Sequence, residues 1–460
     1  MDAPNSPRRP NILFVITDDH QADALGVAGH SMIKTPVLDS LARRGVRFSQ
    51  TTHAGSMVPA ICSPARACLL TGHDFVRSNQ NPGPANEGEA TVDIASDTAT
   101  LPELLGQEGY ETFFCGKWHN DRASFLRSFQ RARRIFHGGM CAHEAVPLIA
   151  DREAFDRGDE AQIGEGFSTE LFCESMADYL RERSPESPFF AWLSLTSPHD
   201  PRTPPESYLA QYEPDSIPLP SAFCPEPKFD NGELDIRDER LAPKPLQEAT
   251  VREHLAGYYG MITHQDEQIG QVLQALDESG EADNTIVVYI GDHGLSLGNH
   301  GLLGKQNLYE HSTRVPFIMA GPGVPAGQCR DGLVYSLDVF ATLLELAGIA
   351  TPSGCASRSL VPEFTTPSGG REEVVSLYKD NQRMVKEARW KLIEYHVNGE
   401  SRIELFDLEA DPHELTNLAG ADESTQTIDR LRRKLSNWQT ETGDRWMPLD
   451  LNTQPISVAS

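Results

Sequence analysis

Five short apolar runs, each followed by polar residues, constrain the fold of this chain more than any other feature of its sequence. Continuous apolar runs of this length are typical of strands that are buried on both faces of a parallel sheet. Segments with helical periodicity lie between them, and this alternation predicts an α/β fold with a doubly wound, mostly parallel sheet. The expected strands are Ile12–Ile16, Thr112–Cys115, Phe189–Leu195, Ile286–Ile290 and Val315–Ala320, and the expected helices are Thr35–Gly45, Leu101–Glu108, Glu170–Arg183 and Arg252–Leu276.

The polar residues that follow four of these runs are rich in Asp, His and Lys. In doubly wound sheets, ligands bind beyond the carboxyl ends of the strands. We therefore expect a catalytic site at that edge of the sheet. The four clusters are Thr17-Asp18-Asp19-His20, Gly116-Lys117-Trp118-His119, Thr196-Ser197-Pro198-His199-Asp200 and Gly291-Asp292-His293-Gly294.

The remaining segments suggest how the chain is divided. Asp200–Ala249 is rich in proline and charge and lacks periodicity, which is typical of a long loop that covers a site. Thr351–Arg371 has the composition of a linker. We predict a catalytic α/β domain over residues 1–350 with an insertion at 200–249, a linker over 351–371, and a small α+β subdomain over 372–460. The subdomain would contain strands at Val374–Tyr378, Arg383–Val385, Trp390–Tyr395 and Glu404–Leu408 and a helix at Thr427–Gln439.

Charge and hydropathy exclude several classes of protein. With 40 Lys and Arg against 67 Asp and Glu, the formal charge is −27, which argues against a nucleic-acid partner. No run of 18 apolar residues exists, so no membrane span is expected. Met1–Pro10 lacks the apolar stretch of a secretory signal, which favours a cytoplasmic enzyme, with a periplasmic or secreted one as the alternative if a signal was removed. None of the eight cysteines forms a CxxC pair, and most are expected to be buried free thiols.

Asp18, Asp19 and Asp292 are candidate metal ligands. Adjacent carboxylates repel each other unless a cation holds them, although a solvated turn is the simpler alternative for one such pair. A second acidic strand end at Asp292 favours the metal. Oxygen ligands suit Ca²⁺ or Mg²⁺, and a nitrogen from His293 would also suit Mn²⁺.

Cys62-Ser63-Pro64-Ala65-Arg66 precedes a helical pattern at Ala67–Leu70. A proline near a helix start places Cys62 at the helix N-terminus, where the free N–H groups favour an anion. Arg66, four residues further on, can face the same point. The pattern indicates an anion pocket with a reactive group at its mouth, and a buried thiol beside a helix cap is the alternative.

This pentapeptide resembles the Cys-x-Pro-x-Arg signature of the sulfatase family. Asn11–Asp19 resembles the first strand of that family, and Leu405-Phe406-Asp407-Leu408 resembles its C-terminal ending. The likeness covers nearly the whole chain and implies an alkaline-phosphatase-like fold. Other matching segments are Leu70-Thr71-Gly72, Thr35–Phe48, Gly116-Lys117-Trp118-His119, Pro198-His199, Asp292-His293-Gly294, Gly304-Lys305 and Asp411–Leu418.

The resemblance implies that Cys62 is oxidised to formylglycine by a formylglycine-generating enzyme of the host. It also implies one divalent metal ion, expected to be Ca²⁺ with Mn²⁺ or Mg²⁺ as alternatives. One hydroxyl of the hydrated aldehyde would attack sulfur, and the second would later expel sulfate. The implied metal ligands are Asp18, Asp19, Cys62, Asp292 and His293. The implied catalytic residues are Cys62, Arg66 (charge at the formylglycine), Lys117 and Lys305 (sulfate oxygens), His119 (proton acceptor) and His199 (general acid).

The expected reaction is hydrolysis of a sulfate monoester of a small molecule or, more specifically, of a glycan. Three alternatives are open. The first is a phosphonate or phosphate ester hydrolase, because His293 stands where many sulfatases carry Asn. The second is a non-catalytic protein that binds sulfated glycans. The third is a serine hydrolase, because Gly294-Leu295-Ser296-Leu297-Gly298 matches G-x-S-x-G, although no strand-to-helix turn is expected there.

A basic stretch in this acidic chain allows two interpretations. It is either a solvated helix face or a subsite for anionic sugars, and the segments His137–Met140 and His143-Glu144 are further candidates to border the substrate. The stretch contains Arg122, Arg127, Arg131, Arg133 and Arg134.

Overall fold

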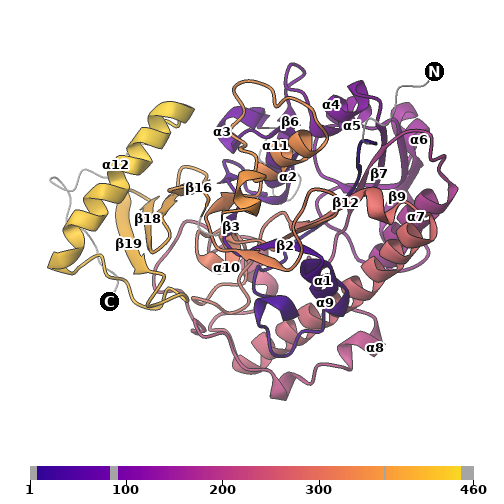
Figure 1. Cartoon of the computed structure of the whole chain (residues 1–460). Helices are drawn as coiled ribbons and strands as arrows, with labels where there is room; N and C mark the ends of the chain where they lie inside the picture. Colours follow the sequence, from indigo (N-terminus) through magenta and orange to yellow (C-terminus); the bar gives the residue numbers. More distant parts are fainter. Residues whose placement is uncertain (1–7, 83–91, 367–368, 447–460) are drawn as a thin grey trace.

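The computed structural model describes residues 8–82, 92–366 and 369–446, so the outer ends of the expected first and last units lie outside the described residues. A ten-stranded mixed sheet in the order β10-β9-β8-β7-β11-β1-β12-β13-β2-β14 forms the centre of the larger part of the molecule (Figure 1). Its strands are β1 (Asn11–Thr17), β2 (Gly45–Phe48), β7 (Glu111–Trp118), β8 (Arg131–His137), β9 (Pro147–Asp151), β10 (Gln162–Ile163), β11 (Phe189–Ser194), β12 (Thr285–Gly291), β13 (Phe317–Ala320) and β14 (Gln328–Arg330).

The middle of the sheet is parallel, as predicted. Strands β8, β7, β11, β1 and β12 all run in the same direction. The expected strand at Val315–Ala320 differs, because β13 pairs with β12 in the antiparallel direction. Between these two strands the only helix is the four-residue α10 (Glu310–Thr313). A parallel pair needs a crossover connection, usually a longer helix, so here the chain re-enters the sheet from the edge at which it left.

Helices cover both faces of the sheet, which explains the continuous apolar runs. In β1, Ile12 and Phe14 belong to one core cluster, whereas Leu13 and Val15 belong to another. Both sets are buried, and each such side chain contributes about 2 kcal/mol to stability. One face is covered by α2 (Cys62–Thr71), α4 (Leu101–Gln107), α5 (Arg122–Ser128) and α11 (Asp338–Leu346), and the other by α1 (Pro36–Arg43), α7 (Ser168–Glu182) and α9 (Glu248–Glu278).

A second sheet, of five strands in the order β19-β18-β17-β16-β4, carries the helix α12 (Thr425–Thr442) on one face, at the left of Figure 1. Four strands come from the C-terminal part: β16 (Val374–Tyr378), β17 (Gln382–Lys386), β18 (Trp390–Val397) and β19 (Glu400–Asp407). The fifth, β4 (Gly55–Ser56), comes from the N-terminal part and pairs with β16. The predicted domain boundaries stay a prediction, since one strand of the C-terminal sheet is supplied from residues before 350.

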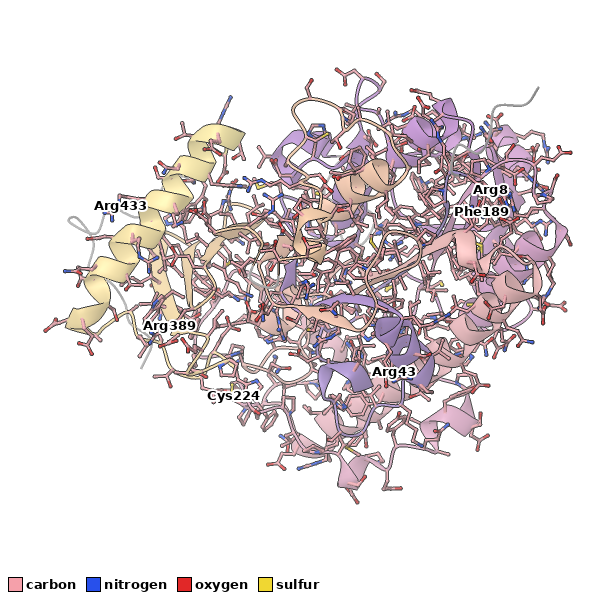
Figure 2. All side chains as sticks on the ribbon, in the orientation of Figure 1. Arg8, Arg43, Phe189, Cys224, Arg389 and Arg433 are labelled. Atoms are coloured by element: carbon pink, nitrogen blue, oxygen red, sulfur yellow. The ribbon has the colours of Figure 1, made fainter. Side chains whose placement is uncertain are left out.

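Apart from its last two residues, which begin α9, the segment 200–249 contains only short helices, as expected for a long loop. These are α8 (Glu206–Leu209) and the 3₁₀ turns at Pro214–Ser216 and Asp238–Leu241. Side chains fill the space between the layers throughout (Figure 2). The remaining elements are the short strands β3 (Thr51–Thr52), β5 (Asn79–Pro82), β6 (Val92–Ile94) and β15 (Val334–Tyr335), the helices α3 (Phe75–Ser78) and α6 (Arg152–Arg157), and 3₁₀ turns at Gly26–Ala28, Ala282–Asn284, Pro362–Phe364 and Asp422–Ser424.

The five arginines of the basic stretch do not share a helix face, so that interpretation was wrong. Two lie in α5 and three in β8, where the strand start is at the edge opposite the carboxyl ends. Four of them pair with glutamates, so the structure gives no support to a subsite for anionic sugars here. The pairs are Arg127–Glu103, Arg131–Glu111, Arg133–Glu182 and Arg134–Glu174, and Arg122 donates to the carbonyl of Asp156.

Two further expectations can be compared with the structure. All eight cysteines are free, but only four are buried, three are half-buried and Cys329 is exposed. The expectation that most are buried thiols was therefore too broad. Among the described residues, no helix combines the length and the apolar character that a membrane span requires.

Candidate active site

The register of the parallel strands brings the predicted polar residues together. Ser194 of β11 is paired with Ile16 of β1 and with Gly116 of β7. Thr17 of β1 is paired with Gly291 of β12. The next residues of these strands therefore emerge side by side at the carboxyl edge, as the sequence predicted.

The turn after β1 directs two carboxylates into the same site. Asp19 has a positive φ of 62°, a conformation that Asp adopts more readily than most residues. The hydroxyl of Tyr258 in α9 donates to the carbonyl of Asp19 at 2.7 Å and holds this turn. The amide of Asp292 donates to the carbonyl of Thr17 at 3.0 Å, which aligns the second acidic strand end.

Potential ligand atoms from Asp18, Cys62, Asp292 and His293 all lie within 4.8 Å of one another, and all four residues are buried. Burial and the nearby carboxylate of Asp18 raise the pKa of Asp292 to about 6. Within the described part of the chain, Oδ1 of Asp18 and Nε2 of His293 find no hydrogen-bond partner, and these two atoms lie 3.6 Å apart. Two ligand atoms that each lie about 2.3 Å from the same ion are separated from each other by a distance similar to this one. The donor set therefore fits a divalent cation.

Asp19 also belongs to this edge of the site. Its Oδ1 lies 3.3 Å from Nδ1 of His293, and its Oδ2 lies 3.9 Å from Nε2 of His199. A second group of potential ligands, Asp18, Asp19 and His199, partly overlaps the first. All the predicted metal ligands are thus brought together.

Cys62 is the first residue of α2, as predicted from the following Ser-Pro. Nζ of Lys305 donates to its Sγ at 3.5 Å, and the buried ring of His119, whose two nitrogens find no hydrogen-bond partner among the described residues, lines the same pocket as Cys62. Burial alone would raise the pKa of the thiol, but the ammonium groups of Lys117 and Lys305 outweigh it and hold the pKa well below its ordinary value. The site thus stabilises negative charge at position 62.

Arg66 lies one helical turn after Cys62, and each of its three guanidinium nitrogens contacts an oxygen beneath the site. Its Nε donates to Asp292 at 3.0 Å and its Nη2 approaches Asp18 at 3.3 Å. Its Nη1 donates to Oγ of Ser194, a residue that the sequence did not single out. Lys117 pairs with Asp18 and donates to the carbonyl of Gly139. These two cations neutralise buried carboxylates that would be costly alone.

His199 faces the cavity from the loop after β11. Its Nδ1 lies 2.8 Å from the carbonyl oxygen of Asp200, and because a carbonyl can only accept, this nitrogen carries the proton and donates it. Burial opposes its protonation, but the carboxylate of Asp19 outweighs it and raises the pKa of His199 to about 9. His143 holds the loop through the carbonyl of His199 at 2.9 Å. Of the suggested bordering segment His143-Glu144, His143 thus supports the loop that carries His199 and does not line the pocket.

Comparison with known proteins agrees with this geometry. A family model described as sulfatase matches residues 10–349, which is more than half of the chain, and one described as N-sulphoglucosamine sulphohydrolase, C-terminal, matches residues 298–441.

The chain belongs to the sulfatase family.

Relatives of this sulfatase span nearly its whole length. It is 30% identical to an ulvan-active sulfatase from Formosa agariphila, over 97% of this chain and 84% of the relative. It is 29% identical to the multifunctional alkaline phosphatase superfamily protein PehA from Trinickia caryophylli, over 95% and 96%. A solved structure in complex with its substrate D-glucosamine-2-N,6-O-disulfate has a TM-score of 0.80 at 23% identity, covering 97% of this chain and 100% of that one. That last likeness concerns the fold, which is alkaline-phosphatase-like as expected.

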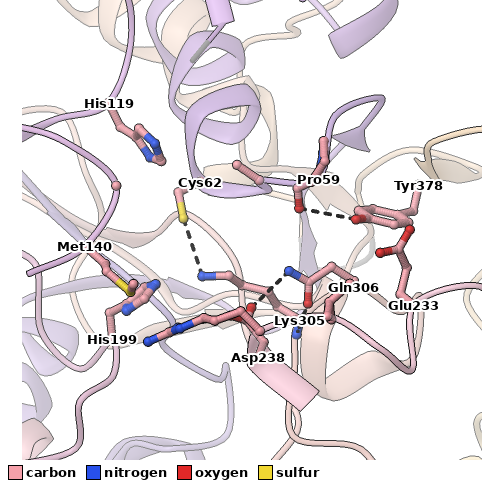
Figure 3. A pocket seen from close by; sticks show the side chains of 14 residues that line it. Pro59, Cys62, His119, Met140, His199, Glu233, Asp238, Lys305, Gln306 and Tyr378 are labelled. Carbon is pink, nitrogen blue, oxygen red and sulfur yellow. Dashed lines mark hydrogen bonds and ion pairs between the residues drawn. The ribbon is translucent and has the colours of Figure 1, made fainter. Parts of the chain in front are cut away.

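A pocket opens from Cys62 in this sulfatase and extends toward the C-terminal sheet (Figure 3). Of the predicted residues, it exposes Cys62, His119, His199 and Lys305, whereas Arg66 and Lys117 lie beneath it. Gly139 and Met140, from the suggested bordering segment His137–Met140, also line it. Its outer wall contains residues that sequence reasoning missed, since they lie in the aperiodic segment 200–249 and in β16. The other lining residues are Pro59, Ala60, Glu233, Ile236, Arg237, Asp238, Gln306 and Tyr378.

The loop that carries Lys305 is held by the segment 200–249. Both carboxylate oxygens of Glu239 accept from the amide of Leu303, at 3.1 and 3.0 Å, and Oε1 also accepts from the amide of Gly304 at 2.8 Å. Glu239 is buried, and no local sequence pattern indicated its role. The position of Lys305 thus depends on this insertion.

Ser296 of the G-x-S-x-G match is not placed as a nucleophile. Its Oγ lies 2.7 Å from Nε2 of His311, but the side chain is fully buried and does not line the pocket. The residues around it form a loop, and the next helix begins only at Glu310. The strand-to-helix turn of serine hydrolases is therefore missing at this position, which contradicts that alternative.

Proposed function

We propose that this sulfatase hydrolyses a sulfate monoester on a carbohydrate, with a formylglycine made from Cys62 and one divalent cation. One observation carries the proposal: the sulfur of Cys62 lies both within the cluster of potential metal ligands and 3.5 Å from the ammonium of Lys305. Buried charges of this density are costly in a purely structural role. A site for an anion beside a cation explains them.

Asp18, Asp19, Asp292 and His293 would hold the ion, with the side chain at position 62 as a further ligand. Carboxylate oxygens dominate this set, which suits a hard cation; Ca²⁺ is our first candidate, with Mn²⁺ and Mg²⁺ as alternatives. When bound, the cation would lower the pKa of the attacking hydroxyl and offset charge on the sulfate.

Formylglycine, when formed, would supply a hydrated aldehyde with two hydroxyl groups, one for attack and one for release of sulfate. The surrounding side chains have separate tasks in this proposal. Lys305 reaches the pocket and is placed to bind a sulfate oxygen. Lys117, beneath it, offsets the charge that develops near Asp18. Arg66 stabilises negative charge at position 62 from the helix side.

Two histidines would move protons. His119 lines the same pocket as Cys62 with both ring nitrogens unpartnered among the described residues, and it would accept a proton from a hydroxyl at position 62. His199 uses Nδ1 for the carbonyl of Asp200, which leaves Nε2 for the leaving oxygen of the ester. The two rings lie on different sides of Cys62 in Figure 3, so attack and departure would be served separately.

The test is made on protein produced together with a formylglycine-generating enzyme. Mass spectrometry across Cys62 should find the aldehyde or its hydrate, and a panel of sulfated sugars and 4-nitrophenyl sulfate should be hydrolysed. Cys62→Ala should abolish turnover with an unchanged circular dichroism spectrum. Full turnover by Cys62→Ala would overturn the proposal, and a modified protein with no turnover would favour the non-catalytic glycan binder.

A phosphonate or phosphate ester hydrolase is the second candidate. His293 contributes a nitrogen ligand to the metal cluster, and PehA, a relative at 29% identity, is described as multifunctional. The rates for a 4-nitrophenyl sulfate and a 4-nitrophenyl phosphonate, which share a leaving group, decide between the two. A higher kcat/KM for the sulfate supports the proposal, and a higher value for the phosphonate supports the alternative.

A further inference from the structure

The pocket of this sulfatase has two ends with different charge. At the Cys62 end, Lys305 presents its ammonium group toward the pocket. The opposite end is formed by Glu233, Gln306 and Tyr378, with Asp238 between the two ends (Figure 3). A sulfate at Cys62 would therefore place the rest of the substrate against carboxylates.

The one arginine among the described lining residues is already neutralised. Nη1 of Arg237 lies 2.9 Å from Oδ1 of Asp200 and 3.1 Å from Oδ1 of Asp238, and its Nη2 pairs with the other oxygen of Asp200. Burial favours the neutral form of Asp238, but the ammonium of Lys305 outweighs it and lowers the pKa, so that this carboxylate is ionised. Arg237 is thus held by two carboxylates and is not free to bind a second anion.

Lys379, which lies next to Tyr378 of the pocket wall, is likewise paired with a carboxylate. Nζ of Lys379, in the turn after β16, donates to Oε1 of Glu233 at 2.6 Å. Nδ2 of Asn381 reaches the same oxygen at 3.4 Å. Burial raises the pKa of Glu233, and the bond from Lys379 opposes this rise. Each carboxylate oxygen can accept more than one hydrogen bond, so Glu233 retains acceptor capacity toward the pocket.

We propose that Glu233 and Asp238 restrict the substrate to sugars whose sulfated ring carries no second anionic group. Hydroxyl groups or an amino group would donate to these carboxylates, whereas a second sulfate or a carboxylate would meet like charge and, among the described residues that line this end, no unpaired cation. Met140, Ile236 and Pro59 add apolar surface for the face of a sugar ring. The inference rests on the proposed function and assigns the substrate class of the same site.

The experiment uses the modified full-length protein and hexosamine sulfates with one O-sulfate at each ring position. Each is prepared with a free amine, an N-acetyl group or an N-sulfate, and 4-nitrophenyl sulfate is the reference. For the position that is cleaved, kcat/KM for the amine and N-acetyl forms should exceed that for the N-sulfate by at least about tenfold. Equal or better cleavage of the N-sulfate, or cleavage of the aryl sulfate alone, would overturn the inference. No turnover of any ester would instead contradict the proposed function, and with it the inference.

Two variants test which residues discriminate between sugars with one and with two anionic groups. Glu233→Gln removes the carboxylate and releases Lys379, so the preference for the singly charged sugar should fall at least fivefold; Asp238→Asn is the second variant. Asp235→Asn makes the same chemical change at a side chain that is 92% exposed in the same segment, and it should keep the wild-type preference. Wild-type preference in both folded pocket variants would overturn the assignment to these residues.

Discussion

Nζ of Lys305 lies 2.8 Å from Oδ1 of Asp19, so a buried ammonium from the loop after β12 pairs with a carboxylate from the end of β1. Both side chains are almost fully buried. The same ammonium contacts Sγ of Cys62, and it therefore joins the acidic cluster to the position where we expect the substrate.

Replacing Lys305 should affect catalysis more than folding. In Lys305→Ala the site loses a preorganised positive charge, and we expect kcat/KM for a sulfate ester to fall by about 10²–10³-fold. Steady-state kinetics on the modified protein check this. Lys34→Ala, which removes an ammonium that only reaches Gln211 near the surface, serves as the matched control. A loss of less than threefold would mean that Lys305 is structural.

Removal of the divalent cation should destabilise the protein as well as inactivate it. An ion present at about 100 times its Kd stabilises the folded state by about 2.7 kcal/mol. Chelation should therefore lower the Tm of the wild type by a few degrees, and added Ca²⁺ should restore it. Asp292→Ala should lose this dependence, whereas Asp215→Asn, at an exposed position, should keep it. A wild-type Tm that changes with neither chelator nor Ca²⁺ would contradict the proposed metal site.

Gly116→Ala should disrupt the sheet beside the site. A Cβ at Gly116 would lie 1.9 Å from the carbonyl oxygen of Ser194, and φ is +109°. Gly109 also has a positive φ, of +89°, but nothing lies within 4 Å of its Cβ. Gly109→Ala therefore measures the backbone cost alone, about 1–2 kcal/mol, and Gly116→Ala should exceed it by at least about 2 kcal/mol. Denaturant unfolding measures the loss of unfolding free energy in each variant. Equal losses would show that the backbone near Ser194 shifts to accommodate the new Cβ at little cost.

The ion pair between Arg383 and Asp444 should make stability depend on pH. Nε of the buried Arg383 donates to Asp444 at 2.8 Å; burial would raise the pKa of this carboxyl, but its bonds to Arg383 outweigh that and lower it. A group with a depressed folded pKa stabilises the fold above its unfolded pKa, about 3.9, and loses this contribution as the pH falls through the folded value. Asp444→Asn should therefore cost about 3 kcal/mol at pH 7.

The pH profile of that loss is the decisive measurement. The difference in unfolding free energy between the wild type and Asp444→Asn should narrow progressively below about pH 4. Asp411→Asn, at a half-buried position that makes no ion pair with Arg383, is a suitable control. A difference that stays constant from pH 7 to pH 3 would show that Asp444 does not titrate with a depressed pKa.

Much of the catalytic edge was predictable from local sequence. Apolar runs that are buried on both faces identified β1, β7, β11 and β12, and the polar residues after them are the ones that converge. The Ser-Pro after Cys62 marked the start of α2. These predictions were confirmed because periodicity and helix starts depend on neighbours a few residues away.

The outer pocket could not be predicted in this way. Tyr378 donates to the carbonyl of Pro59 across 319 residues of sequence, and Glu233 meets Lys379 across 146. The direction of β13 and the partners of the arginines in β8 depend likewise on the path of the chain. Local patterns contain no information about such distant pairs.

The sequence by itself determined the α/β layers, the family and the polar residues that converge at the carboxyl edge of the sheet, because burial patterns and short motifs depend on consecutive residues. Only the tertiary structure decided that β4 joins the C-terminal sheet, that Glu239 holds the Lys305 loop, and that carboxylates close the far end of the pocket. Those features arise from hydrogen bonds and ion pairs between distant segments, whose geometry exists only once the layers have packed.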